Sequence, residues 1–265
     1  MQLELLDLIF LSDRRKQLLL FLKNGPKNMD DIREALDVTS TAILPQIKKL
    51  KEKFLVVQED KTYKLSLIGE VLVKKMKPLI SITDVFEENF EYWAERDLQG
   101  IPPSFKKRLG ELRKSKLIQP DLDRMFELNP EIAEDLSKSS YILECIAYFD
   151  PPLISMCQEL AKGGVELSFL MSESVFQLYS KEYLEDLRNM LILENVKFFV
   201  YSGELRIANL TVTDRLFMIS LFPKNQKHFD RESLINYEPS AIKFGNELFD
   251  ESLKNSTQIT QKPNE

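Results

Sequence analysis

Residues 39–53 read TSTAILPQIKKLKEK, and this stretch decides how the N-terminal part of the chain is interpreted. Its apolar positions recur at spacings of four and three: Ile43, Ile47 and Leu50. That spacing is typical of the buried face of a helix. The hydroxyl of Thr39 or Ser40 can cap this helix, which we expect to run to about Lys53.

Two further helices are expected before this stretch. Ser12 can cap a helix from Asp13 to Lys23, and Asn28 can cap a short helix that ends at Leu36. A tight connection then leads into residues 39–53. Two short helices joined by such a turn form a helix-turn-helix, whose second helix can enter the major groove of DNA.

A β-hairpin is expected next. The β-prone runs 55–58 and 63–65 surround a polar turn, and Ser66 can cap one more helix. Three helices, a hairpin and a helix follow the order of a winged helix-turn-helix, which we assign to residues 1–77.

Charge is divided unevenly along the chain. Residues 1–77 hold 15 Lys and Arg against 11 Asp and Glu, a net charge of +4. Residues 78–265 hold 21 Lys and Arg against 31 Asp and Glu, a net charge of −10. The whole chain carries a net charge of −6. An excess of basic residues suits a polyanionic partner, so the N-terminal part is the expected site of DNA binding.

The outward residues of the predicted recognition helix, together with the hairpin, form the candidate DNA-contacting set. Lysines in the C-terminal half suit phosphate contact, which gives affinity without sequence information. Gln46 can pair with adenine, and Thr41 or Ala42 can touch a thymine methyl. The candidate residues are Ser40, Thr41, Ala42, Leu44, Pro45, Gln46, Lys48, Lys49, Lys51 and Lys61.

Pro45 and the lysines also allow other interpretations. A proline past the first turn removes a helix hydrogen bond, so we expect the helix to start late or to kink there. Leu44 and Pro45 would then present an apolar tip to the groove or to a protein partner. Lysines at a helix end can also be a solvated face that complements the helix dipole.

The remainder of the chain divides into three parts. Residues 78–138 are expected to form a helical linker or dimerisation region, with Pro78 separating two helical stretches. Residues 139–254 alternate strand and helix patterns, which indicates a parallel sheet with an antiparallel extension. Residues 255–265 are expected to be a disordered tail. The fold class is therefore α+β or α/β: a winged helix, a helical linker and a mixed α/β, sensor-like domain.

No catalytic or metal-binding motif is recognisable. Phosphate-binding glycine loops and hydrolase or protease motifs are absent from the sequence. Cys145 and Cys157 could be a redox pair but are more typical of buried structural cysteines. His228 lies in a polar turn, and Asp214 with Arg215 shapes a turn or contacts a ligand. A cation site at Asp121, Asp123 and Glu127 is weaker than solvated acids at a helix start, since no calcium-loop spacing follows.

We therefore expect no enzyme activity, no cofactor and no metal. No apolar run is long enough to cross a membrane, and the N-terminus has no signal-peptide pattern, so a cytoplasmic location is expected.

Five separated segments, taken together, resemble one family. They are LLDLIFLSDRRKQLLLFL, VTSTAILPQIKKLKE, PDLDRMFELNPE, TDRLFMISLFPKNQKHFD and IKFGNELFD. They are similar to archaeal winged-helix transcriptional regulators whose second half is a methanogenesis-regulatory domain. The resemblance covers about residues 5–254. It departs at His228-Phe229-Asp230 and Phe244-Gly245, where family members often have a Gly-Tyr-Asp-like turn and a Trp before the final Gly.

The resemblance implies a methanogen DNA-binding regulator with a C-terminal sensor or regulatory domain. The expected partners are double-stranded DNA, a second copy of the chain and an unknown small-molecule or protein effector. Two alternatives remain: a winged helix that binds the transcription machinery without reading DNA, and an enzyme carried by the α/β domain.

Overall fold

The computed structural model describes residues 4–120, 129–225 and 230–259. The chain divides into two compact units, Met1–Ile80 and Ser81–Glu265. No helix in the described residues is long and apolar enough to cross a membrane.

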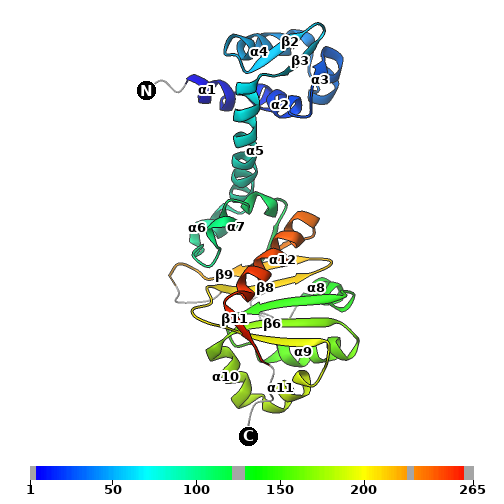
Figure 1. Ribbon diagram of the computed structural model, residues 1–265, viewed down its shortest axis with the longest axis vertical. Helices are drawn as coiled ribbons and strands as arrows, with labels where there is room; N and C mark the ends of the chain where they lie inside the picture. Colours follow the sequence, from blue (N-terminus) through cyan, green and yellow to red (C-terminus); the bar gives the residue numbers. More distant parts are fainter. Residues whose placement is uncertain (1–3, 121–128, 226–229, 260–265) are drawn as a thin grey trace. The chain divides into compact units, whose positions relative to one another are not determined.

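In the first unit, helices and a small sheet surround a single apolar core (Figure 1). Its helices are α1 (Glu4–Phe10), α2 (Asp13–Leu22), α3 (Met29–Leu36), α4 (Ser40–Glu52) and the beginning of α5 (Leu67–Glu88). Its strands are β1 (Lys27–Asn28), β2 (Val56–Glu59) and β3 (Thr62–Leu65), in the antiparallel order β1-β3-β2. The order of α2, α3, α4, the β2–β3 hairpin and α5 is the one that the sequence predicts for residues 1–77, whereas α1 and the two-residue strand β1 are additions to it.

Local capping explains where these helices begin. Ser12 and Thr39 accept hydrogen bonds from backbone N–H groups in the first turns of α2 and α4. Asn28 and Asp31 form a reciprocal capping box at the start of α3. Asp37 ends α3 in the left-handed conformation, at a φ of 47°.

Both prolines that were expected to interrupt helices lie inside them. The helix α4 begins at Ser40 and runs through Pro45, so the expected late start is wrong. The helix α5 runs through Pro78, so the predicted division into two helical stretches is also wrong. Burial of Ile43, Ile47 and Leu50 against the core stabilises α4 and offsets the hydrogen bond that Pro45 removes.

The second unit is built on an eight-stranded mixed sheet of order β11-β7-β6-β5-β8-β9-β10-β4. The parallel strands are β5 (Tyr141–Ile146), β6 (Glu166–Ser172) and β7 (Val196–Tyr201). The antiparallel strands are β8 (Ile207–Thr213), β9 (Phe217–Leu221), β10 (Ser233–Asn236), β4 (Lys116–Ile118) and β11 (Ser256–Gln258). A parallel sheet with an antiparallel extension is the arrangement that the strand patterns predict.

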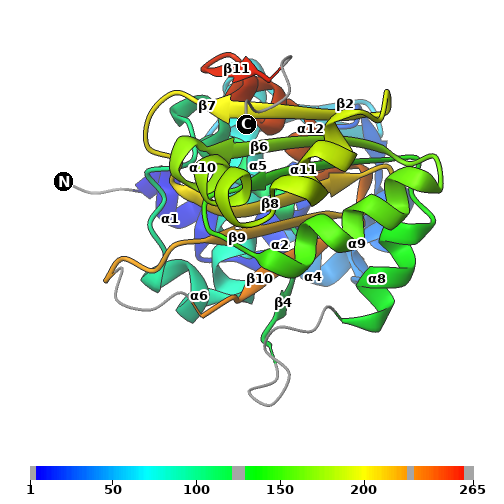
Figure 2. The same cartoon turned by 90° about the horizontal axis from the view of Figure 1, so that it is seen from below.

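Helices cover both faces of this sheet. One face is covered by α8 (Pro130–Ser137), α9 (Pro151–Lys162), α10 (Glu173–Glu182) and α11 (Leu184–Leu191), which Figure 2 shows in front of the strands. The other face packs against α12 (Pro239–Leu253), α6 (Phe90–Glu95), α7 (Pro103–Lys106) and the short 3-10 helix η1 (Leu109–Leu112). Gly245 permits close packing of α12, since a Cβ there would lie 2.5 Å from Phe217.

The segment expected to be a helical linker contributes to the second unit. Residues of α6, α7 and η1 belong to one of its cores, and β4 pairs with β10 at the sheet edge. The expected disordered tail also differs, because Ser256–Gln258 pair with β7 as β11. The acids Asp121, Asp123 and Glu127 lie outside the described residues.

Candidate functional site

The outward face of α4 carries most of the residues that were predicted to contact DNA. Thr41, Leu44 and Pro45 are exposed in its first half, and Lys48 and Lys49 are exposed further along. Ser40, Ala42 and Gln46 are half-buried. The opposite face is closed, since Ile43, Ile47 and Leu50 are at most 2% exposed.

The lysines of this region differ in how firmly they are held. Within the described part of the chain, neither Lys48 nor Lys49 forms an ion pair or a hydrogen bond through its ammonium group. Lys51 donates a hydrogen bond from Nζ to Oε1 of Gln58 on β2, at 2.8 Å. Lys61 is exposed in the β2–β3 turn. The two unpaired ammonium groups on α4 are therefore available to an anion.

Gln46 is engaged inside the protein. Its Oε1 accepts a hydrogen bond from Nη1 of Arg15 at 2.9 Å, and Arg15 also donates from Nε to the backbone oxygen of Leu8. Contact between Gln46 and a base would therefore require the side-chain amide to leave Arg15. Arg15 is not among the site residues predicted from the sequence, and its only signal there is its place in the charged run that interrupts the apolar stripe of α2.

The second unit contains a buried carboxyl group that is not among the residues predicted from the sequence. Glu144 lies in the middle of β5 and is 4% exposed, and Asn209 of β8 donates a hydrogen bond to it. Burial raises the pKa of Glu144 to about 8, while hydrogen bonds from Thr211 and Asn209 act in the opposite direction. The group therefore holds its proton at neutral pH far more often than an exposed glutamate does.

A second polar cluster is centred on Arg96, which is 1% exposed. Its Nη1 donates to Asp230 at 2.6 Å, its Nη2 pairs with Glu232, and its guanidinium lies 4.5 Å from the centre of the Tyr92 ring. Arg231, which lies between Asp230 and Glu232 in the sequence, forms a 2.7 Å ion pair with Asp150. These contacts join chain segments that are far apart in sequence and stabilise their arrangement.

Other residues singled out in the sequence have structural surroundings. Asp214 accepts a hydrogen bond from the backbone N–H of Ser140, and Arg215 pairs with Asp135, so these two residues shape contacts around a turn. Cys145 and Cys157 are buried free thiols, and burial raises the pKa of both. His228 lies outside the described residues. No cluster of three or more potential metal ligands occurs in the described residues.

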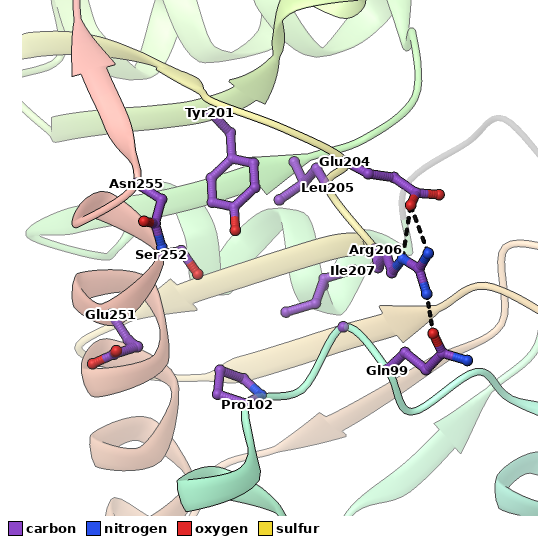
Figure 3. A pocket seen from close by; sticks show the side chains of 11 residues that line it. Gln99, Pro102, Tyr201, Glu204, Leu205, Arg206, Ile207, Glu251, Ser252 and Asn255 are labelled. Atoms are coloured by element: carbon purple, nitrogen blue, oxygen red, sulfur yellow. Dashed lines mark hydrogen bonds and ion pairs between the residues drawn. The ribbon is translucent and has the colours of Figure 1, made fainter.

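An open hollow of about 240 Å³ lies where the end of β7 and the loop after it approach the C-terminal end of α12 (Figure 3). On one wall Arg206 binds Glu204, with Nε 2.8 Å from the carboxylate, and also donates to Gln99. Tyr201 and Asn255 line the other side. Charges of both signs are paired around the opening, so its chemistry suits a small polar molecule more than a strongly charged one.

Two family models match this chain in succession. The N-terminal domain of methanogenesis regulatory protein FilR1 matches residues 3–84, and the middle domain of the same protein matches residues 125–255. The chain belongs to this family. The predicted resemblance to methanogenesis-regulatory proteins is thereby confirmed.

Methanogenesis regulatory protein FilR1 of Methanothrix harundinacea is 22% identical over 258 residues, covering 94% of this chain. The chain spans 57% of the length of that relative.

Solved structures show only distant similarity. The archaeal chromatin protein TrmBL2 is 11% identical, with a TM-score of 0.43 over 97% of this chain and 98% of that one. The phospholipase D family member Nuc of Salmonella typhimurium is 7% identical, with a TM-score of 0.42 over 56% of this chain and 100% of its own. Both scores are low, and neither structure bears on the function.

Proposed function

We propose that the protein is a DNA-binding transcriptional regulator, in which α4 enters the major groove and the β2–β3 hairpin is the wing. The observation that carries this proposal is the pair of exposed, unpaired lysines on α4, Lys48 and Lys49. They lie in the part of the chain with a net charge of +4. The regulatory name of the family supports the proposal, and it also supports the expectation that the protein is not an enzyme.

The proposed contacts divide into two kinds. Lys48 and Lys49, with Lys51 and Lys61 beside them, would neutralise phosphates, and this contact would be nearly independent of sequence. Thr41 and Ala42 in the first half of α4 would touch base edges. Gln46 would join them only after exchanging its hydrogen bond with Arg15 for one with a base.

Fluorescence anisotropy with a labelled DNA duplex at several salt concentrations tests the proposal. The logarithm of the affinity should fall linearly with the logarithm of salt concentration, and Lys48→Ala with Lys49→Ala should reduce the slope by roughly 1 per lysine. The matched control replaces Lys181 and Lys243 in the second unit, both of which are exposed. A flat salt response of the full chain would exclude phosphate contact.

The second unit is the proposed regulatory part, and the active form is proposed to be a homodimer. The open hollow beside Tyr201 is the candidate entry point for a small polar effector, since it combines an aromatic ring with polar side chains at the surface. A thermal-shift screen of small polar metabolites against the full chain and a Tyr201→Ala variant tests this part. Stabilisation of both proteins by the same compound would place its site elsewhere.

A second candidate function is a protein-binding module of the transcription machinery. Leu44 is 45% exposed beside the exposed Pro45, and this apolar tip suits a protein surface better than a phosphate backbone. Affinity capture from cell extract with and without nuclease distinguishes the two functions. Capture of a transcription protein that survives nuclease and is lost with Leu44→Ser, without any DNA binding by the pure chain, would favour this candidate.

A further inference from the structure

Three segments of the first unit meet at a surface that the proposed DNA contacts do not use. Lys53, just past α4, forms a 2.8 Å ion pair with Glu4 at the start of α1. The hydroxyl of Ser66, just before α5, donates to the backbone oxygen of Phe54. The start of α1, the end of α4 and the start of α5 are therefore neighbours.

Large apolar side chains are exposed around this junction. We call them the α1–α5 patch: Leu5 (42% exposed), Leu6 (48%), Phe54 (69%), Leu67 (82%), Ile68 (54%) and Val71 (63%). Two come from α1, one follows α4, and three lie in the first two turns of α5. The core of the unit is complete without them, because Ile9, Leu55, Val73 and Met76 of the same segments are buried.

The size of the α1–α5 patch is that of an interface. If a fully exposed residue of this size offers about 200 Å², the six residues together expose on the order of 700 Å². The largest apolar patch of a typical monomer is about 300–600 Å². Each partner in a standard protein–protein interface contributes about 800 Å².

The charges beside the patch indicate which partner covers it. Exposed acids and bases both lie beside the patch: Glu4, Asp7, Glu52 and Glu70, with Lys53, Lys74 and Lys75. DNA would require a basic rim. A two-fold interface instead joins a surface to itself, so the surface must carry both signs for each charge to meet its opposite.

We infer that the α1–α5 patch binds the same patch of a second copy of this chain, forming an isologous dimer through the first unit. This inference rests on the proposed function, because it supplies the two-fold axis that a pair of recognition helices needs to read a palindromic site. It also assigns the homodimer contact to specific side chains.

Replacement of Leu67 and Ile68 by Glu tests the inference in the full chain. Both residues are exposed at the N-terminal end of α5, where a carboxylate favours the helix dipole, so the fold should persist with an unchanged thermal unfolding profile. Analytical ultracentrifugation should give twice the 30.9 kDa chain mass for the wild type and a single chain mass for the variant. The dimer dissociation constant should rise roughly 100-fold or more, since like charges would face each other across the two-fold axis.

Phe90→Glu is the matched control. Phe90 is 67% exposed at the first position of α6 in the second unit, and this variant should remain dimeric. A monomeric wild type, a dimeric Leu67→Glu/Ile68→Glu variant, or a monomeric Phe90→Glu variant would each overturn the inference.

The outcome is separable from that of the proposed DNA binding. A wild-type dimer that fails to bind DNA would leave the α1–α5 interface standing and remove the DNA-binding function. Salt-dependent DNA binding by a chain that is monomeric at every concentration would leave the DNA-binding function standing and remove the α1–α5 interface.

Discussion

Arg15 of α2 and Gln46 of α4 are joined by a 2.9 Å hydrogen bond from Nη1 to Oε1. The bond connects the start of α2 with the middle of the proposed recognition helix. It also occupies the amide that sequence reasoning assigned to base reading. The orientation of α4 and its proposed reading of DNA would therefore depend on the same side chain.

A double-mutant cycle measures this bond. Gln46→Ala should lower the free energy of unfolding of the first unit by about 1 kcal/mol, because it removes this partly buried hydrogen bond. Arg15→Ala should lower it by more, because it also removes the bond to the backbone oxygen of Leu8. The double variant should lose less than the sum of the two, with a coupling of at least about 0.5 kcal/mol. Urea unfolding followed by far-ultraviolet circular dichroism checks this. Additive losses would show that the bond contributes nothing.

Replacement of Pro45 by Ala should stabilise the first unit. Alanine restores a backbone donor inside α4, and its intrinsic helix preference is higher. The gain should be about 1–2 kcal/mol, since part of it is offset by the greater freedom of the unfolded chain. The Tm of the variant measures this. If affinity for DNA falls while the Tm rises, Pro45 serves the interface; a lower Tm would contradict the helix argument.

Gly69→Ala should destabilise the first unit selectively. A Cβ at this position would lie 2.1 Å from the backbone oxygen of Leu55, just before β2, and neither α5 nor this backbone segment can move apart cheaply. We expect a loss of roughly 3 kcal/mol or more, with Glu70→Ala as a nearly neutral exposed control. Hydrogen exchange should accelerate in β2, β3 and α4 and stay unchanged in β5 and β6. Equal acceleration in both units would contradict the division of the chain.

The raised pKa of Glu144 predicts that the stability of the second unit depends on pH. Burial raises its pKa from 4.5 in the unfolded chain to about 8 in the folded chain, so between these values the folded state holds more protons. The contribution of Glu144 to the free energy of unfolding should therefore be largest below pH 4.5. It should then fall by roughly 3–5 kcal/mol as the pH rises through about 8.

Glu144→Gln removes the titration and keeps the shape of the side chain. Scanning calorimetry at several pH values between about 5 and 9 should show a flatter stability profile in this variant than in the wild type. Asp214→Asn, at an exposed carboxylate, is the control and should keep the wild-type slope. An unchanged slope in Glu144→Gln would place the pH dependence elsewhere.

Local chemistry made much of the fold predictable. The caps at Ser12, Asn28 and Thr39 depend on residues three positions away, so they are readable from the sequence. The apolar runs of β5, β6 and β7 were visible for the same reason. The late helix start expected at Pro45 and the helix division expected at Pro78 were wrong, because packing of the surrounding helix outweighs the single hydrogen bond that a proline removes.

Long-range pairing explains what was missed. The three residues of β4 carry no signal until β10 pairs with them from more than 100 positions away. Arg96 likewise pairs with residues far away in the sequence, Asp230 and Glu232. Glu144 and its partner Asn209 are 65 positions apart. The exposed lysines of α4 were predictable from helical spacing, whereas the bond that holds Gln46 was not.

The two buried thiols of the second unit sit on opposite sides of one sheet. Cys145 of β5 belongs to the core beneath α12, and Cys157 of α9 belongs to the core beneath α8–α11. The sequence has two cysteines in all, so a thiol reagent can label the folded chain only when one of these layers opens. The relative labelling rates of the two positions therefore act as a built-in reporter. They reveal, without any engineered probe, which helical layer detaches first when the sheet is disturbed.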